Sequence, residues 1–193
     1  MTTGRPRAWR LILAAAGVVV AVALIEFWMG RLPLGPDGHF GWLETDIWSR
    51  EQSQRVLDPY SASHLIHGFL FYGFLRLVAP RMSIGARLVA AIGLEAGWEI
   101  LENSPIIINR YRAVTIAQGY VGDSILNSIS DVAMAALGFV LAWRFPVKAS
   151  VALIAATEIA MLVCYRDNLT LNILMLAVPL EAIRTWQMEG KPH

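Results

Sequence analysis

The segment E-A-G-W-E-I-L-E-N-S-P at residues 95–105 places three carboxylates along one face of a predicted α-helix. Glu95, Glu99 and Glu102 are separated by four and three residues, the spacing at which side chains stack above one another on a helix. The segment ends an apolar run, in which ionised side chains are costly unless something compensates them. It therefore predicts an apolar helix that carries a polar site.

Two other segments show the same arrangement. In G-D-S-I-L-N-S-I-S-D, Asp123, Asn127 and Asp131 recur every four residues. His64 and His67 are three residues apart near the start of another apolar segment. Each of these sets again occupies one helical face. We expect the three faces to meet in one polar site inside a bundle of membrane helices.

The composition indicates a membrane protein. Hydrophobic residues make up 56% of the 193-residue chain, charged residues only 16%, and the mean hydropathy is +0.50. Soluble domains carry about 25% charged residues. The net charge of +1 gives no electrostatic case for binding nucleic acid. Cys164 is the only cysteine, which excludes an internal disulfide and a paired-cysteine metal or redox motif.

The apolar segments predict an all-α fold, a polytopic transmembrane helix bundle of five or six spans that forms a single integral membrane domain over residues 1–193. A signal peptide is the alternative for the first run, but that run is about 19 residues long and lacks a small-residue cleavage site. The last segment contains Asn172 and Pro179 and either spans the membrane or lies partly in the interface. The predicted helices are Leu11–Met29, Ala62–Val78, Ser83–Leu101, Asp123–Trp143, Ala149–Tyr165 and Leu169–Ile183.

Residues 30–60 are of a different kind, with several prolines and glycines and no apolar run, and we expect an extramembrane loop there. A short amphipathic helix is predicted around Asp46–Gln54. Ser61 or Ser63 is expected to cap the helix that follows. Between the third and fourth helices, N-R-Y-R at residues 109–112 indicates a basic loop.

The distribution of lysine and arginine predicts the orientation. With six spans and a cytoplasmic N-terminus, ten of the 16 basic residues, Arg5 and Arg7 among them, fall on the cytoplasmic side. The positive-inside rule supports this orientation. The loop at 30–60 then lies outside, and the polar ends of the second, third and fourth helices converge on that same outer side.

The side chains at the outer end point to a metal-assisted enzyme that acts on a lipid-linked or envelope substrate. One divalent metal ion would activate water while a spare carboxylate acts as general base, and zinc, manganese, iron and magnesium all remain open. The predicted metal ligands are His64, His67, Glu95 and Glu102, the predicted catalytic residues are Glu99, Asp123 and Asp131, and the predicted substrate-binding residues are Asn103, Arg110, Arg112, Asn127, Asp167 and Asn168.

Each feature also has a structural interpretation. The glutamate stripe can pair with Arg110 and Arg112, Asp123 can cap a helix, and R-D-N at 166–168 can be a turn. Two other function classes follow: a structural or assembly protein whose acids are all paired, and a small-solute or ion transporter. The lipid bilayer is the expected partner, nucleic acid is not, and the oligomeric state stays open. The sequence names no partner for Glu158.

Four segments together resemble uncharacterised protein family 0314: S-H-L-I-H-G-F-L-F-Y-G, E-A-G-W-E-I-L-E-N-S-P, G-D-S-I-L-N-S-I-S-D and R-D-N-L-T-L-N. The resemblance covers about Glu51 to Gln187. It implies a multi-pass inner-membrane protein of alphaproteobacteria, whose outer side is periplasmic, and it implies no assigned activity. The matching positions are His64, His67, Glu95, Glu99, Glu102, Asn103, Asp123, Asn127, Asp131, Asp167 and Asn168.

Overall fold

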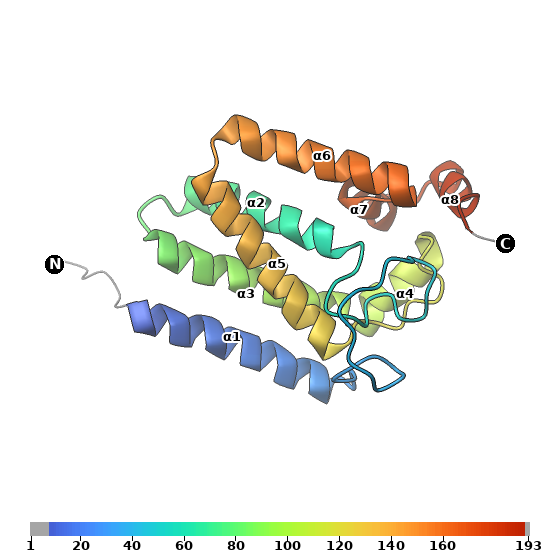
Figure 1. The fold of residues 1–193 in the computed structure, drawn as a ribbon, viewed down its shortest axis with the longest axis horizontal. Helices are drawn as coiled ribbons and strands as arrows, with labels where there is room; N and C mark the ends of the chain where they lie inside the picture. Colours follow the sequence, from blue (N-terminus) through green and yellow to red (C-terminus); the bar gives the residue numbers. More distant parts are fainter. Residues whose placement is uncertain (1–7, 192–193) are drawn as a thin grey trace.

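The computed structural model describes residues 8–191, and this part of the chain is built from eight helices (Figure 1). The all-α prediction is confirmed. Arg5 and Arg7, which enter the predicted orientation, lie outside the described residues. The helices are α1 (Ala8–Trp28), α2 (Ser61–Val78), α3 (Ile84–Glu102), α4 (Pro105–Val114), α5 (Ile125–Arg144), α6 (Val147–Tyr165), α7 (Leu169–Ala177) and α8 (Glu181–Met188).

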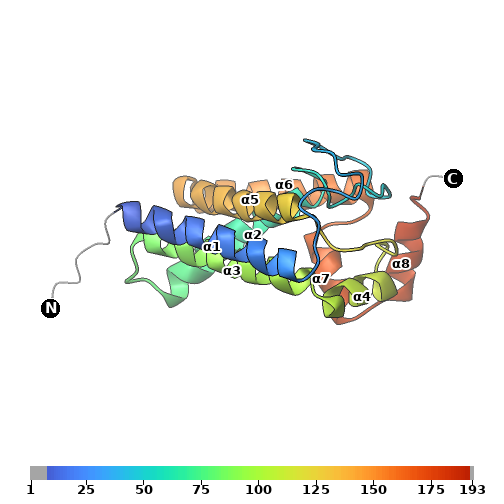
Figure 2. The ribbon, with the colours of Figure 1, turned by 90° about the horizontal axis from the view of Figure 1, so that it is seen from below.

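The five long helices lie beside one another, and residues 30–60 and the short helices gather at one end of them (Figures 1 and 2). α5 packs against α2 and α3, and α3 packs in turn against α1. α6 lies at the opposite edge from α1 and touches the bundle more lightly. Val22, Ile92, Ala96 and Val132 form a buried apolar cluster where α1, α3 and α5 meet. We refer below to the end that carries residues 30–60, α4, α7 and α8 as the loop end.

α2 and α5 approach each other most closely at two glycines. A Cβ atom on Gly68 would lie 2.0 Å from the carbonyl oxygen of Ala135, and one on Gly138 would lie 2.0 Å from that of Leu65. Both distances are far below van der Waals contact, so the two backbones touch directly. Small residues permit such close approach between membrane helices. This contact holds the start of α2, which carries the two paired histidines, against α5.

Within residues 8–191, three helices are long and apolar enough to cross a membrane, namely α1, α5 and α6. They contain 21, 20 and 19 residues, close to the ~20 that the hydrocarbon core requires. α1 and α6 bury little of their surface, and exposed apolar side chains such as Trp28 and Val163 suit a lipid environment. These features support membrane association. α2 and α3 are of similar length, but they carry several polar side chains.

The predicted sixth helix is broken in two. α7 has 9 residues and is therefore about 14 Å long, half of the ~30 Å hydrocarbon thickness. Pro179 disfavours a helical conformation at Val178, so the helix ends there. α8 lies at the loop end (Figure 2). Arg184 and Lys191 therefore lie at the loop end and not at the opposite end, where the six-span prediction places them. With this change, the basic residues number eight at each end, in place of the predicted ten on the cytoplasmic side and six outside.

Residues 105–114 form a helix rather than the predicted basic loop, so that prediction is wrong. Pro105 occupies the first helical position, where its fixed φ favours a helix and its missing N–H costs nothing. Ile108 is buried beneath the helix, which gives the segment an apolar side to pack. The arginines of N-R-Y-R are carried on α4 as a result.

Residues 46–54 form turns, so the predicted amphipathic helix there is wrong. The Asp46 carboxylate accepts the N–H of Trp48 at 2.8 Å, and the Ser49 hydroxyl accepts the N–H of Glu51 at 3.0 Å. Such short-range bonds stabilise turns and offer the backbone an alternative to a helix.

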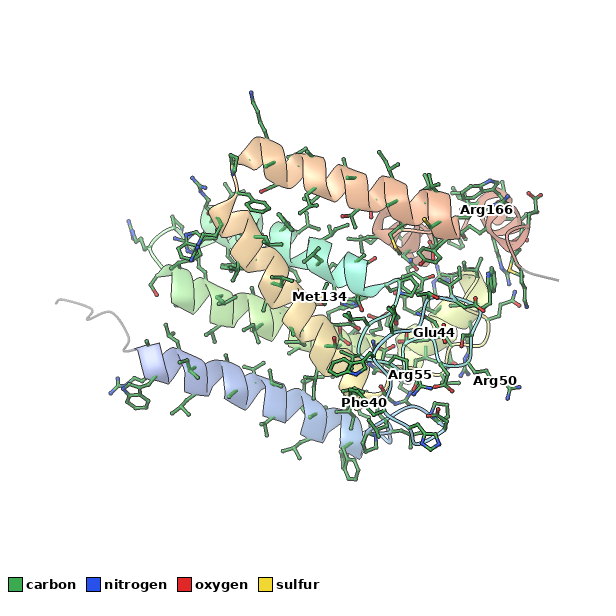
Figure 3. The ribbon with its side chains drawn as sticks, in the orientation of Figure 1. Phe40, Glu44, Arg50, Arg55, Met134 and Arg166 are labelled. Atoms are coloured by element: carbon green, nitrogen blue, oxygen red, sulfur yellow. The ribbon has the colours of Figure 1, made fainter. Side chains whose placement is uncertain are left out.

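The loop at 30–60 is bonded to the start of α5. The N–H of Ser124 donates to the carbonyl oxygen of Ser53 at 3.0 Å, and the Asn127 amide donates to that of Arg55 at 2.9 Å. Arg55, labelled in Figure 3, also pairs with Asp37 inside the loop at 2.8 Å. The loop therefore covers the polar ends of the long helices rather than standing away from them.

The N-terminus of α2 is capped from outside the helix. The Asp58 carboxylate accepts the N–H groups of Tyr60 at 2.8 Å and Ser61 at 3.0 Å. Ser61 and Ser63 both lie inside α2, so the predicted serine cap is wrong. A carboxylate at this position also offsets the positive end of the helix dipole.

Ser83 and Ser104 occupy the same N-cap position of α3 and α4, yet only Ser83 makes a capping bond, which it accepts from the N–H of Ala86 at 3.2 Å. Ser83→Ala should therefore lower the free energy of unfolding by about 1 kcal/mol. Ser104→Ala is the matched control and should change it much less. Thermal unfolding in detergent measures both, and equal effects would contradict the assignment of the cap.

Candidate functional site

His64 connects three helices at the loop end of the bundle. Its Nδ1 atom lies 2.5 Å from Glu95 Oε1 and 3.3 Å from Glu99 Oε1, both on α3. Its Nε2 atom lies 3.8 Å from Asp131 Oδ2 on α5. His64 sits on the first turn of α2 and is buried. The three faces expected from the sequence thus come together around one imidazole.

His67 lies one turn further along α2 and shares Glu95 with His64. Its Nδ1 atom is 3.1 Å from both carboxylate oxygens of Glu95. The ring also contacts Trp98 edge-on, with the two ring centroids 6.2 Å apart. Glu95 is completely buried, and two imidazoles face its carboxylate. Its charge is therefore compensated by its neighbours.

Glu99 and Asp131 are not compensated in this way. Neither carboxylate oxygen of Glu99 has a hydrogen-bond partner among the described residues, although its side chain is 0% exposed. Asp131 Oδ1 also lacks a partner, and Asp131 is 3% exposed. A buried polar atom without a partner costs about 1–3 kcal/mol, and more when it is charged. The site therefore contains buried carboxylate oxygens that its own side chains leave without a donor or a cation.

Two sets of side chains could hold a metal ion. One is His64, His67 and Glu95, and the other is His64, Glu99 and Glu102. Within each set the ligand atoms lie within 4.8 Å of one another. Imidazole and carboxylate ligands suit zinc, manganese and iron, and carboxylates also suit magnesium. The four predicted metal ligands thus divide between two overlapping sets, and the second set includes Glu99.

Asp123 belongs to a network just before α5. Its carboxylate accepts hydrogen bonds from the Tyr120 hydroxyl at 2.9 Å and from the Asn103 amide at 2.9 Å. Its own N–H donates to Asn103 Oδ1 at 2.7 Å. Burial raises the pKa of Asp123, while these donors lower it in part. The cap of α5 is Ser124, whose hydroxyl accepts the N–H of Asn127 at 3.2 Å, so Asp123 does not cap the helix itself.

Arg110 and Arg112 have structural partners. Arg110 donates two hydrogen bonds, at 2.8 and 3.0 Å, to the carbonyl oxygen of Leu176 on α7. Arg112 donates to the carbonyl oxygen of Tyr120 at 2.5 Å. Among residues 8–191 neither arginine forms an ion pair with Glu95, Glu99 or Glu102, so the structural pairing that the sequence allows does not occur. Both guanidinium groups instead fix segments near the site.

The residues between α6 and α7 also form a structural network. Asn168 caps α7 by accepting the N–H of Leu171 at 2.8 Å. Glu158 on α6 accepts the N–H groups of Leu169 and Thr170, both at 3.1 Å, which identifies the partner that the sequence did not name. Two side chains, those of Asn168 and Glu158, therefore cap one short helix, as expected near the positive end of its dipole.

Asp167 is held by four donors. Its carboxylate accepts hydrogen bonds from the Tyr60 hydroxyl at 2.7 Å, the Gln187 amide at 3.0 Å, the Asn172 amide at 3.1 Å and the N–H of Asn168 at 2.9 Å. Asp167 thus connects the start of α2 to α7 and α8. Asp167 does not itself line the cavity at the loop end, but its donors Tyr60 and Asn172 do.

Burial raises the pKa of Asp167 to about 6, and its donors, Tyr60 first, lower the pKa only in part. Because this pKa exceeds the ordinary value of ~3.9, the folded protein favours the neutral carboxyl more than the unfolded chain does. Its stabilising contribution is complete below about pH 4 and is lost as the pH rises through about 6. From pH 4 to 7.5, wild type should lose about 2 kcal/mol of unfolding free energy relative to Asp167→Asn. A difference between the two proteins that is constant with pH, in thermal melts, would contradict this.

A cavity of about 480 Å³ opens above the histidines. This volume lies in the range of ligand sites in proteins. Among the predicted site residues it is lined by His64, His67, Glu102, Asp123, Asn127 and Asp131. Glu95, Glu99 and Asn103 are buried and do not line it, and neither do Arg110, Arg112, Asp167 and Asn168. The structure thus brings together the histidines and acids, whereas most of the predicted substrate-binding residues stand outside the lining.

Two features of the site are missing from the sequence-based prediction. Six aromatic side chains line the cavity: Trp48, Tyr60, Phe71, Trp98, Tyr111 and Tyr120. Glu26 on α1 is completely buried near Ser128 and Asp123, and neither of its carboxylate oxygens has a hydrogen-bond partner among the described residues. A lone carboxylate in a long apolar run was the available signal for Glu26. The aromatic residues carry no spacing that would single them out.

Comparisons with known proteins find one family model, "Protein of unknown function (DUF2585)", which matches residues 26–189. The chain is 49% identical over 178 residues to a UPF0314 protein of Sphingopyxis alaskensis, covering 92% of this chain and 95% of that protein. It is 51% identical over 170 residues to a UPF0314 protein of Paracoccus denitrificans, covering 88% of each. It is 50% identical over 183 residues to one of Novosphingobium aromaticivorans, covering 92% of each. No solved structure matches the chain.

Proposed function

The chain belongs to the DUF2585 family of proteins of unknown function, and we propose that it is a metal-assisted membrane enzyme acting on a lipid or envelope substrate. The predicted resemblance to uncharacterised protein family 0314 is confirmed by its relatives. The observation that carries the proposal is Glu99, a completely buried carboxylate that has no hydrogen-bond partner within residues 8–191. It lies 3.3 Å from the imidazole that both potential metal-ligand sets share.

The proposed topology is a single integral membrane domain with five spans, α1, α2, α3, α5 and α6, in the bacterial inner membrane. The N-terminus is cytoplasmic, and the loop at 30–60 is periplasmic. Basic residues are equal in number at the two ends, but the cytoplasmic connections around Arg81 and Lys148 are short and contain no acid, and short loops are the ones that govern orientation. The candidate site then faces the periplasmic side.

His64, His67 and Glu95 are the proposed metal ligands. Three protein ligands leave a position open for water or substrate, as in catalytic zinc sites. Such an ion, when bound, lowers the pKa of a water molecule and polarises the bond to be cleaved. Asp131 lies beside the far nitrogen of His64 and would orient that ring, in the way that outer carboxylates orient ligand histidines.

Glu99 is the proposed general base. It lies beside His64, and no donor within the described residues satisfies its oxygens, so it is free to accept a proton. Asp123 faces the cavity with its carboxylate fixed by Tyr120 and Asn103, and there it would hold the leaving group or deliver a proton to it. Asn127 lines the cavity beside them. The set therefore supports hydrolysis rather than simple binding.

Hydrolysis of a lipid extract by the purified protein tests this proposal. With a divalent metal added, wild type should release water-soluble products that mass spectrometry detects. Glu99→Gln should lower that rate at least about 100-fold, the scale of general-base catalysis. Glu181→Gln, which changes an exposed carboxylate on α8, is the control and should retain the rate.

Two results would contradict the enzyme. A proton- or ion-coupled flux in liposomes, without product formation, would favour a transporter. Full function of an Asp131→Asn strain, together with stably co-purifying protein partners, would favour an assembly role. The paired arrangement of Glu95 with two histidines is the feature that an assembly role would explain best.

A further inference from the structure

The cavity combines aromatic rings with acidic side chains. Its aromatic lining comes from the loop at 30–60, from residues 115–124 between α4 and α5, and from α2, α3 and α4. Its acidic lining consists of Asp58, Glu102, Asp123 and Asp131. Tyr111 and Tyr120 meet edge to face, with ring centroids 5.5 Å apart, and the Tyr120 hydroxyl donates to Asp123. The two tyrosines and this carboxylate form one corner of the cavity.

Not every acid in the cavity is free to bind a ligand. The Asp58 carboxylate accepts hydrogen bonds from the backbone N–H groups of Ser53, Tyr60 and Ser61. Its oxygens are therefore already occupied by structural hydrogen bonds. Glu102 forms no ion pair with lysine or arginine among residues 8–191. Asp131 lines the cavity, and its Oδ1 atom has no hydrogen-bond partner in the described part of the chain.

Positive charge is scarce in the same space. Apart from Asp58, five carboxylates in or behind the lining surround two imidazoles, namely those of Glu95, Glu99, Glu102, Asp123 and Asp131. The other basic residues at the cavity are Arg50 and Lys191, which are exposed at its rim, and Figure 3 shows Arg50 at the outer edge of the loop end. Carboxyl groups outnumber basic groups here, and a bound cation stabilises their ionised form, so the cluster favours a cation and disfavours an anion.

An organic cation suits the remaining charge better than a second metal ion. Asp123 and Asp131 belong to neither set of potential metal ligands. Aromatic rings do not coordinate hard metal ions, but their faces attract ammonium groups within about 6 Å of the centroid. The cavity already shows such a contact at its rim, where the Lys191 ammonium lies 5.5 Å from the centroid of the Trp48 ring.

We infer that the cavity binds an amphiphile with an ammonium-bearing headgroup, held between the Tyr111–Tyr120 corner and the carboxylates of Glu102 and Asp123. Apolar side chains of α2, α3 and α7, including Phe71, Trp98, Ile173 and Leu176, line other parts of the cavity and offer a surface to the apolar chain. This inference deepens the proposed function, on which it rests, because it names the chemical class of the substrate.

Binding of short-chain lipids to the full-length protein in detergent tests the inference. The probes are dioctanoyl phosphatidylethanolamine and phosphatidylcholine, with dioctanoyl phosphatidylglycerol as the anionic counterpart and free ethanolamine and choline as water-soluble amines. Quenching of tryptophan fluorescence reports occupancy, because Trp48 and Trp98 both line the cavity. Each titration is repeated with EDTA, so that metal-free binding is measured separately.

The amine-headed lipids should bind at least about tenfold more tightly than phosphatidylglycerol and than the free amines. Tyr111→Leu and Glu102→Gln should each weaken that binding about tenfold. Tyr165→Leu removes a half-buried tyrosine outside the cavity and should leave the binding unchanged. Helix content measured by circular dichroism shows whether Tyr111→Leu is folded, so that a loss of binding can be assigned to the missing ring. Glu102→Gln is a second test that changes the shape of the side chain less.

Equal or tighter binding of phosphatidylglycerol would overturn the inference, as would the absence of binding by any probe. Free amines that bind as tightly as the lipids would overturn the inference that the ligand is an amphiphile, and would identify a water-soluble amine as the ligand. These outcomes are separate from those of the proposed function. A metal-dependent enzyme without preference for amine headgroups would overturn the inference alone, and amine-lipid binding that persists in EDTA without any hydrolysis would overturn the enzyme alone.

Discussion

Gly138→Val should prevent α2 and α5 from assembling. A Cβ atom on Gly138 would lie 2.0 Å from the carbonyl oxygen of Leu65 and 3.2 Å from Gly68 Cα. Its first neighbour is backbone, which cannot rotate away as a flexible side chain can, so the helices must separate. Overpacking of this kind costs about 3 kcal/mol or more, a large part of the stability of a typical domain.

Gly73→Val is the matched control for this change. Gly73 lies on α2 as well, and a Cβ atom there would have nothing within 4 Å. It should yield monodisperse protein with nearly the melting temperature of wild type, whereas Gly138→Val should aggregate or melt many degrees lower. Size-exclusion chromatography and thermal melts in detergent measure both. Equal behaviour of the two variants would mean that α2 and α5 do not meet at their glycines.

Glu95→Gln should abolish tight metal binding, with a loss of affinity of at least about 100-fold. Glu95 is the carboxylate that both His64 and His67 face, and the proposed ligand set has no other acid. Replacing it by an amide keeps one acceptor oxygen but removes the negative charge that the two buried or half-buried imidazoles share. The apparent dissociation constant of zinc, measured by competition with a chelating dye, reports this effect.

Glu102→Gln distinguishes the two overlapping ligand sets. Glu102 belongs only to the set of His64, Glu99 and Glu102. We expect its replacement to change zinc affinity by no more than about threefold, because the other set keeps all three ligands. If Glu102→Gln lost the metal and Glu95→Gln retained it, the second set would be the metal site, and Glu99 would be a ligand rather than the general base.

Much of the polar site could be predicted because helix geometry alone determines it. Spacings of three, four and seven residues fix Glu95, Glu99 and Glu102 on one face, and the cost of burying them in an apolar segment requires other polar faces to meet that face. Their convergence with His64 and Asp131 followed without any knowledge of packing. The helix limits of the long segments followed from their apolar content.

Other features depend on contacts between distant parts of the chain. Arg110 and Arg112 are bonded to backbone carbonyl oxygens of Leu176 and Tyr120, which no charge pattern in the sequence specifies. The aromatic lining of the cavity is drawn from separate loops and helices and has no common period. Pro179 is a sequence signal for the break between α7 and α8. Around Asp46 the turn signals are weak, and the same residues also show an amphipathic pattern that predicts a helix.

The metal content of freshly purified protein tests the central claim most directly. Elemental analysis should find about one divalent metal ion per chain in the wild type. His67→Ala should lose that ion with its helix content unchanged, and His39→Ala, which alters an exposed histidine in the loop at 30–60, should retain it. Wild-type protein that holds no metal, even after supplementation with zinc, manganese, iron and magnesium, would contradict the metal site and leave the histidines and glutamates as a structural ion-pair network.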